Sequence, residues 1–298
     1  MFTLAHLSDP HLAPLPTPRF SELASKRIFG FLHWQHKRRD IHRRDSLDAI
    51  IGDVATQGSD HIAFTGDLVN ISLLDEFAAA RSWLAVLGSP HDITVIPGNH
   101  DAYVRSTLGK AAAFWGPYMR GDDSPDSTLP FVRRRGGVAM IGLSTAIASP
   151  PLMSTGRLGA TQIAQLTELL AELRTERLFR VVLIHHPPES EPHRRRERLL
   201  DAEAFRSVLA NTGAELVLHG HDHLSSVTWL DGPERRIPAV GVPSASAAPG
   251  GRWQPAGYNL YRIDGEPHAW HCEMIARGFQ PGSGMISEIG RRILLRAS

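Results

Sequence analysis

The chain has 298 residues, a formal net charge of +1 and a single cysteine, Cys272. A net charge this small gives no global field that would attract nucleic acid, and one cysteine excludes a disulfide within the chain. The N-terminus lacks the basic start of a signal peptide, and no apolar run approaches the roughly 18 residues of a spanning helix. We therefore expect a cytoplasmic protein with no nucleic-acid partner, and leave open a peripheral position at the inner membrane surface.

The N-terminal part of the chain alternates between strands and helices. Short apolar strands are predicted over residues 2–7, 61–65 and 91–96. Between them lie two amphipathic helices, the first capped by Ser46 and the second running over about residues 75–87. The first helix has apolar residues at the helical spacing i, i+3, i+4 and i+7: Leu47, Ile50, Ile51 and Val54. This order of elements predicts a parallel sheet with right-handed crossovers.

Residues 14–44, which we call the insertion, combine prolines, apolar side chains and basic side chains. The loop over residues 12–18 is rich in proline, and the segment 19–44 sets aromatic and aliphatic residues among many lysines and arginines. A segment of this kind can lie on an anionic membrane surface, or it can bind an anionic substrate or a nucleic acid. It can also be a helix that packs its apolar side over the mouth of a site. The residues leave these interpretations open.

The middle of the chain resumes the alternation of strands and helices. Apolar strands are predicted over residues 138–143, 180–184 and 214–218. An amphipathic helix begins at Thr161, and another contains Phe205 and its apolar neighbours. These elements extend the α/β pattern of the N-terminal part.

The C-terminal part, from about residue 224, is rich in predicted strands. Its short apolar runs are separated by Gly, Pro and Asp, which is typical of an antiparallel meander. The runs cover residues 227–230, 237–242, 258–263 and 268–275. Since we find no internal repeat and no clear linker, we predict a single domain over residues 1–298.

Metal-binding side chains gather at the ends of the predicted strands. The strand over residues 91–96 ends at a Pro-Gly turn, which is followed by Asn99, His100 and Asp101. Open α/β sheets bind their ligands outside these strand ends, and residues i and i+2 of an extended chain point the same way. Seven residues at or just past strand ends carry such groups: Asp9, His11, Asp67, Asn99, His185, His221 and His223.

The chemistry of these seven side chains predicts two metal ions. Carboxylate and amide oxygens together with imidazoles suit Mn, Fe, Zn or Co better than calcium. Seven ligands are too many for one tetrahedral ion, but they can fill two adjacent sites that share a carboxylate. Two ions about 3.5–4 Å apart clamp the attacking and leaving oxygens of phosphoryl transfer and acidify a bound water. We therefore expect two divalent or mixed-valence transition-metal ions.

The motifs along the chain are Asp9-Pro10-His11, Gly66-Asp67, Gly98-Asn99-His100-Asp101, His185 and Gly220-His221-Asp222-His223. In this order they resemble the motifs of the calcineurin-like metallophosphoesterase superfamily. The resemblance implies an α/β fold, a four-layer α-β-β-α sandwich of two mixed sheets flanked by helices, over nearly the whole chain. A parallel first half followed by a β-rich C-terminal part agrees with that fold.

The resemblance also implies a role for each ligand. Asp67 bridges the two ions. The first ion is bound by Asp9, His11 and His223, and the second by Asn99, His185 and His221. We choose His185 over its neighbour His186 because members of the superfamily place the ligand two residues before a proline, here Pro187.

The resemblance further implies a mechanism and two catalytic residues. A hydroxide that bridges the metals attacks phosphorus in line. His100 contacts a phosphoryl oxygen or protonates the leaving group, and Asp101 orients His100. A carboxylate beside an imidazole stabilises its charged form, which agrees with this pairing.

The motifs His-His-Pro-Pro and Gly-His-Asp-His resemble the bacterial class III cyclic-nucleotide and glycerophosphodiester phosphodiesterases. This resemblance implies a metal-dependent phosphoric ester hydrolase that acts on a small phosphodiester rather than a monoester. The insertion is longer and more basic than expected in that branch, so a phospholipid-directed, phospholipase C-like activity is an alternative, with residues 19–44 in contact with the membrane. A non-catalytic phosphate-binding protein on the same fold is a second alternative.

Overall fold

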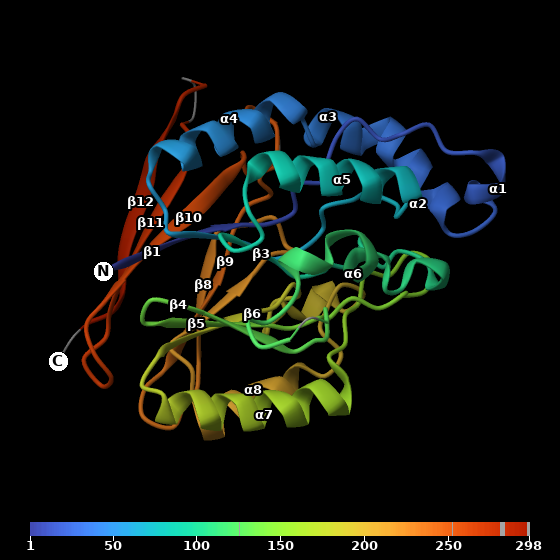
Figure 1. Cartoon of the computed structure of the whole chain (residues 1–298). Helices are drawn as coiled ribbons and strands as arrows, with labels where there is room; N and C mark the ends of the chain where they lie inside the picture. The colour runs from blue at the N-terminus through green and yellow to red at the C-terminus, as the bar shows by residue number, and fades with distance from the viewer. Residues whose placement is uncertain (125, 252, 281–283, 297–298) are drawn as a thin grey trace.

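The computed structural model describes residues 1–124, 126–251, 253–280 and 284–296. Within these residues two six-stranded mixed sheets pack face to face, and helices cover their outer faces (Figure 1). This is the four-layer α/β sandwich that the sequence predicts.

The first sheet has the strand order β12-β11-β10-β1-β2-β3. Strands β1, β2 and β3 run parallel, as the alternating N-terminal pattern predicts, and β10 joins β1 in the antiparallel sense. The strands are β1 (Phe2–Leu7), β2 (His61–Phe64), β3 (Ile93–Val95), β10 (Gly257–Asp264), β11 (His271–Phe279) and β12 (Ile286–Leu295).

The second sheet has the order β4-β5-β6-β7-β9-β8, with parallel central strands and an antiparallel strand at each edge. Along β6, Phe179, Val181 and Leu183 face the core between the sheets, whereas Val182 faces the helices. Burial on both faces explains why Val181, Val182 and Leu183 form a continuous apolar run in this strand. The strands are β4 (Phe131–Arg135), β5 (Val138–Gly142), β6 (Phe179–Leu183), β7 (Leu216–His219), β8 (Ser226–Leu230) and β9 (Ile237–Gly241).

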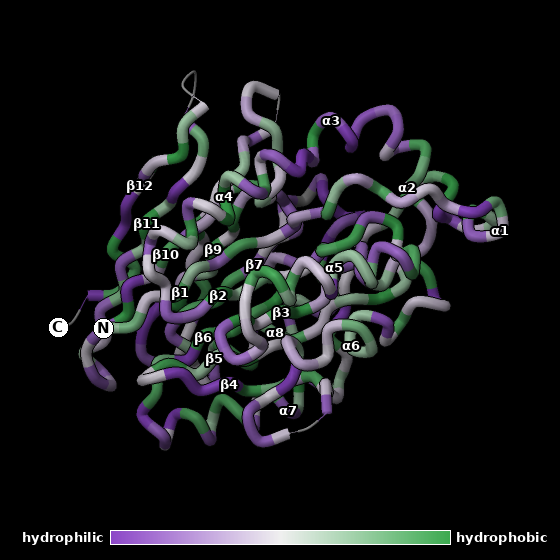
Figure 2. Tube along the Cα trace, turned by 45° about the horizontal axis from the view of Figure 1, so that its top comes forward, coloured by the Kyte–Doolittle hydropathy of each residue, from purple (hydrophilic) through white to green (hydrophobic). Residues whose placement is uncertain are grey.

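Helices α4 and α5 lie over the first sheet, and α7 and α8 lie over the second (Figure 1). The hydrophobic residues concentrate on the inner strands β1, β2 and β3, whereas the segment around α3 is mostly hydrophilic (Figure 2). No helix among the described residues is long and apolar enough to cross a membrane. The α-helices are α1 (Phe20–Leu23), α2 (Arg27–His33), α3 (Arg39–Ile41), α4 (Arg44–Thr56), α5 (Leu74–Leu87), α6 (Lys110–Trp115), α7 (Gly159–Thr175) and α8 (Ala202–Thr212).

The prediction of one C-terminal meander is wrong. Strands β8 and β9 pair with each other in the second sheet, where β9 also runs parallel to β7. Strands β10, β11 and β12 form an antiparallel set in the first sheet, beside β1. The C-terminal part is thus divided between the two sheets, because each group adds to an edge that earlier strands have left open.

Two strands, β4 and β12, are absent from our sequence prediction. Strand β4 has the sequence Phe-Val-Arg-Arg-Arg. Its Arg133 is buried, and the guanidinium donates hydrogen bonds to the carbonyls of Arg120, Pro90 and Ile93, which compensate for the loss of water. Strand β12 is largely exposed and lies at the edge of the first sheet, where it pairs with β11. Charged and exposed strands of this kind lack the apolar alternation on which the prediction rests.

The starts of two helices also differ from the prediction. Ser46 does not cap α4, which begins at Arg44 after an extended Arg43 whose N–H donates to the carbonyl of Ser246 at 2.8 Å. Helix α7 begins at Gly159, two residues before Thr161. The carboxylate of Asp201 accepts the N–H of Gly159 at 2.8 Å, so a residue far along the chain determines this start.

Asp53 on α4 links the helix layer to the C-terminal strands. Its carboxylate accepts hydrogen bonds from the Arg277 guanidinium on β11, at 2.7 and 2.8 Å, and from the Tyr258 hydroxyl on β10. Burial raises the pKa of Asp53, but the hydrogen bonds from Arg277 and Tyr258 outweigh it and lower that pKa below its ordinary value. The ion pair therefore stabilises the folded state wherever the carboxylate is ionised.

We predict that Asp53→Asn lowers the free energy of unfolding at pH 7 by about 1.5–3 kcal/mol, the range for hydrogen bonds to charged groups. Because the folded pKa is lowered, this contribution is present above the unfolded pKa and disappears as the pH falls through the folded value. Urea unfolding at pH 7 and pH 3 measures both effects.

The matched control is Asp48→Asn, which breaks an exposed pair with Arg44 on the same helix and should change stability by less than about 0.5 kcal/mol. Equal losses in the two variants at pH 7 would contradict the prediction.

Candidate metal centre

The loops that follow five parallel strands meet at one end of the sandwich. Strand β1 leads to Asp9 and His11, and the loops after β2, β3 and β6 carry the next three predicted ligands. Strand β7 leads to the remaining two. The structure brings together all seven residues predicted from the sequence: Asp9, His11, Asp67, Asn99, His185, His221 and His223.

Unusual backbone conformations turn these side chains inward. Among the described residues, nine non-glycine residues have a positive φ, and five of them are predicted ligands: Asp9, His11, Asp67, His221 and His223. This left-handed conformation is uncommon for side-chain-bearing residues, and it clusters at functional sites. The concentration of such residues here supports a functional centre.

Glycines in the motifs allow the loops to approach closely. A Cβ atom at Gly66, where φ is +104°, would lie 2.7 Å from His185 Nδ1 and 2.6 Å from the Gly98 nitrogen. A Cβ at Gly220 would lie 2.5 Å from the Asp9 carboxylate. Since real Cβ atoms do not come this close, any larger residue would displace a predicted ligand.

The four residues predicted to bind the first ion, Asp9, His11, Asp67 and His223, lie close together. His223 Nε2 lies 3.2 Å from Asp9 Oδ1, and His11 Nε2 lies 3.9 Å from Asp9 Oδ1 and 3.8 Å from Asp67 Oδ2. The other ring nitrogen of His11 donates to the Val69 carbonyl at 3.1 Å. This hydrogen bond leaves the lone pair of the buried Nε2 facing the carboxylates, the arrangement typical of a metal-ligating histidine.

The four residues predicted to bind the second ion, Asp67, Asn99, His185 and His221, also lie close together. His185 Nε2 lies 3.4 Å from Asp67 Oδ2 and 3.1 Å from Asn99 Oδ1, while its Nδ1 donates to the Thr65 carbonyl at 2.6 Å. His221 Nδ1 lies 3.0 Å from Asn99 Oδ1. Asp67 Oδ2 thus faces both sites, which is the geometry of a bridging carboxylate.

The charges at the centre favour a bound cation. Although burial raises the pKa of Asp9, interactions with His223 and His185 outweigh it, so this pKa lies below its ordinary value. Burial lowers the pKa of His185, but the carboxylates of Asp67 and Asp9 raise it to about 10. Burial holds the pKa values of His11 and His221 well below the ordinary value, so these imidazoles are neutral, the form that binds a metal.

These features fit a pair of metal ions. His11 Nε2 and His221 Nε2 are buried and have no hydrogen-bond partner among the described residues. Two neutral imidazoles, an amide oxygen and two ionised carboxylates converge with His185, whose extra proton a metal ion would displace on binding. A donor set of this kind is suited to transition-metal ions.

The His186 ring lies beside His221, with the ring centroids 4.2 Å apart, but neither of its nitrogens is directed at a predicted ligand. Its Nδ1 lies 2.6 Å from the Thr145 hydroxyl, and its Nε2 lies 2.9 Å from the Ser154 carbonyl. Both ring nitrogens therefore have partners elsewhere.

The expectation that Asp101 orients His100 is wrong. The Asp101 carboxylate instead accepts the backbone N–H groups of Asp67 at 2.8 Å, Gly98 at 2.8 Å and Val69 at 3.1 Å. It ties the loop after β2 to the loop after β3, so it positions the bridging Asp67. Backbone donors carry no sequence signal, which is why the motif alone suggested the neighbouring imidazole.

His100 is held by other groups. Its Nδ1 donates to the Asn70 carbonyl, and its Nε2 accepts a hydrogen bond from the Arg38 guanidinium at 2.9 Å. Its ring stacks on Tyr103 with the centroids 5.5 Å apart. Burial and the charge of Arg38 lower the pKa of His100 to about 3, so the imidazole is neutral at pH 7.

The insertion supplies residues that the sequence analysis missed. Arg38 lies at the end of a π-helical turn (Trp34–Arg38) and reaches His100, and His42 lies beside His11 with ring centroids 4.4 Å apart. Both line a cavity of about 570 Å³ together with residues of both metal sites. The insertion therefore forms a wall of the site, although its composition alone gave no reason to single out these two residues.

The comparisons with known proteins agree with this geometry. A family model described as calcineurin-like phosphoesterase matches residues 2–225. The chain belongs to this family. Membership implies a dinuclear divalent metal centre and supports a metal-dependent phosphoester hydrolase. A search of curated proteins found no match.

Two solved structures show how far the calcineurin-like phosphoesterase fold extends over the chain. A dimetal phosphatase from Danio rerio has 13% sequence identity and a TM-score of 0.59, and the alignment covers 99% of each chain. A purple acid phosphatase from yellow lupin seeds has 12% identity and a TM-score of 0.60, with 96% of this chain and 52% of that chain covered. At such low identities the similarity shows the fold alone.

We predict that Asp67→Ala loses both metal ions, because one carboxylate faces both sites. Metal content per chain, measured by plasma mass spectrometry after chelation and reloading with manganese, tests this. Asp75→Ala, an exposed acidic residue in the first turn of α5, is the control and should bind as much metal as the wild type. An Asp67→Ala protein that retains two ions per chain would show that the bridging assignment is incorrect.

Proposed function

We propose that this protein is a dinuclear metal-dependent phosphodiesterase. The observation that carries the proposal is the placement of Asp67 between two complete ligand sets, 3.8 Å from His11 Nε2 and 3.4 Å from His185 Nε2, with His100 and Arg38 alongside. A phosphate-binding protein could use the same fold, but it would not need every ligand together with a neutral imidazole at the centre.

The residues around the centre have complementary tasks. Two bound ions would supply Lewis acidity for the phosphoryl group and for a water nucleophile. Asn70 orients His100, and Arg38 places a positive charge where an oxygen of the phosphoryl group would bind. Burial and the charge of Arg38 both lower the pKa of His100, and a phosphodiester anion that engages Arg38 would offset the second of these causes. The raised pKa would favour uptake of a proton from water at Nε2, which His100 would then donate to the leaving oxygen.

The shape of the cleft favours a diester over a monoester. The cavity beside the metal ligands adjoins a second cavity of about 470 Å³, and the two share Arg38, Asn99 and His100. A diester carries a substituent on each side of phosphorus, and the paired cavities provide room for both. The resemblance of the motifs to bacterial cyclic-nucleotide and glycerophosphodiester phosphodiesterases supports the same preference.

A phospholipid is a second candidate substrate, because the second cavity has an apolar rim. Phe29 from the insertion and Leu152 from the loop after β5 line it, and their exposed fractions are 53% and 77%. Leu152 has a φ of +62°, a strained conformation for a leucine, and it is nonetheless solvent-exposed. Lys26 lies over the Tyr103 ring at the same end. Apolar groups beside a cation suit an amphiphilic phosphodiester at an anionic membrane surface.

Hydrolysis of bis-p-nitrophenyl phosphate and p-nitrophenyl phosphate, with manganese added after chelation, tests the main proposal. We predict a higher kcat/KM for the diester. A higher value for the monoester would instead indicate a phosphatase. Loss of activity on both substrates, in a protein that still binds two ions, would favour a non-catalytic phosphate-binding protein.

Co-sedimentation with anionic phospholipid vesicles tests the membrane contact. We predict that the wild type sediments with the vesicles at low salt and that the double variant Phe29→Ser/Leu152→Ser does so less. Val86→Ser, an exposed apolar residue at the end of α5, is the control and should behave as the wild type. If the wild type remains in the supernatant at low salt, the substrate is better sought among soluble phosphodiesters.

A further inference from the structure

His42 is a buried histidine of the insertion that no motif identifies. It lies between α3 and α4 in an extended conformation, and its exposed fraction is 2%. The backbone on both sides is anchored to the segment after β9: Arg43 N donates to the Ser246 carbonyl at 2.8 Å, and Ala248 N donates to the Ile41 carbonyl at 2.7 Å. The position of His42 is therefore determined by the fold.

One ring nitrogen of His42 is held by two serines. Its Nδ1 lies 2.9 Å from Ser246 Oγ and 3.4 Å from Ser244 Oγ. Ser244 Oγ donates its own proton to the Asp9 carbonyl at 2.7 Å, so it can only accept from His42. This arrangement favours a proton on Nδ1 and leaves the lone pair on Nε2, the same pattern as in His11.

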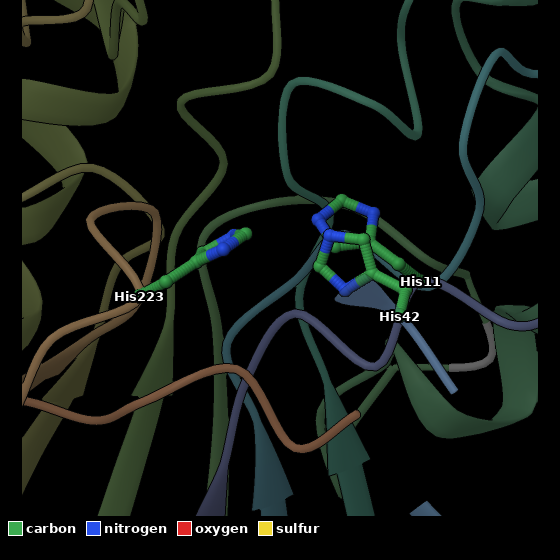
Figure 3. Close-up of side chains that lie close together, drawn as sticks. All are labelled: His11, His42 and His223. Carbon is green, nitrogen blue, oxygen red and sulfur yellow. The ribbon is translucent and has the colours of Figure 1, made fainter. Parts of the chain in front are cut away.

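The ring lies beside two ligands of the first site. Its centroid is 4.4 Å from that of His11 and 5.5 Å from that of His223, and the three side chains approach one another from different segments (Figure 3). One nitrogen from each of the three rings lies within 4.8 Å of the others. Two nitrogens bound to one ion at about 2.0–2.1 Å are at most about 4.2 Å apart, so a small contraction would suffice.

We propose that His42 is a further protein ligand of the metal ion in the first site, joining Asp9, His11, Asp67 and His223. The inference rests on the proposed dinuclear centre. It makes the insertion part of the metal site and gives the first ion three imidazoles and two carboxylates. Such a nitrogen-rich set favours zinc or iron over manganese, whereas the second site has two imidazoles, an amide and the shared Asp67 carboxylate.

The test compares His42→Asn with the wild type. The asparagine amide can replace Nδ1 beside Ser246, but no atom of asparagine reaches the place of Nε2. His36→Asn is the matched control, because His36 is an exposed histidine of the same insertion. Zinc affinity is measured by competition with a chromophoric chelator, and the cobalt-loaded proteins are compared by their visible absorption spectra.

We expect His42→Asn to bind the first ion at least about 10-fold more weakly, with an altered cobalt spectrum, and His36→Asn to match the wild type. Equal zinc affinity and an unchanged spectrum in His42→Asn would overturn the inference while leaving the proposed function intact. A wild-type protein that binds no metal would overturn both.

The metal-loaded wild type provides a measurement that does not depend on the folding of a variant. In its crystal structure we expect His42 Nε2 at about 2.0–2.1 Å from the first ion. A ring nitrogen beyond 3 Å, with a water between it and the ion, would overturn the inference.

Discussion

The centre depends on keeping two buried carboxylates, Asp9 and Asp67, ionised and close to each other. An isolated buried carboxylate is costly, so such groups are found where other charges or metals compensate them. Here the nearby imidazoles lower the pKa of both carboxylates, and the carboxylates in turn raise that of His185. The two carboxylates thus attract positive charge to the centre, and a bound metal ion would supply it in place of the His185 proton.

The surrounding loops stabilise the left-handed backbone conformation that Asp9 and Asp67 adopt. Asp101 gathers three backbone N–H groups from the loops after β2 and β3, so Asp67 is supported by its neighbours rather than by its own backbone preference. Gly66 and Gly220 permit the loops to approach to distances that any side chain would prevent. Because the supports come from several strand ends, a change in one loop would disturb ligands on the others.

The insertion joins the centre to the outer layers of the sandwich. It contributes Arg38 and His42 to the cavity, and it continues directly into α4. That helix is in turn tied by Asp53 to Arg277 on β11. The insertion is therefore held between the predicted metal ligands and the C-terminal strands, although its composition alone suggests a separate addition to the fold.

The amino-acid sequence by itself determined the central strands, the main helices and the seven candidate ligands, because these residues lie at or just past the ends of strands whose apolar pattern is local. Only the tertiary structure decided the partner of Asp101, the approach of His42 to His11, and the division of the C-terminal strands between two sheets. Those features depend on contacts between distant segments, such as Arg43 with Ser246 or Gly159 with Asp201, and on backbone groups that every residue carries. The spacing of apolar residues within one helix or strand carries no information about such contacts, so only the folded chain shows them.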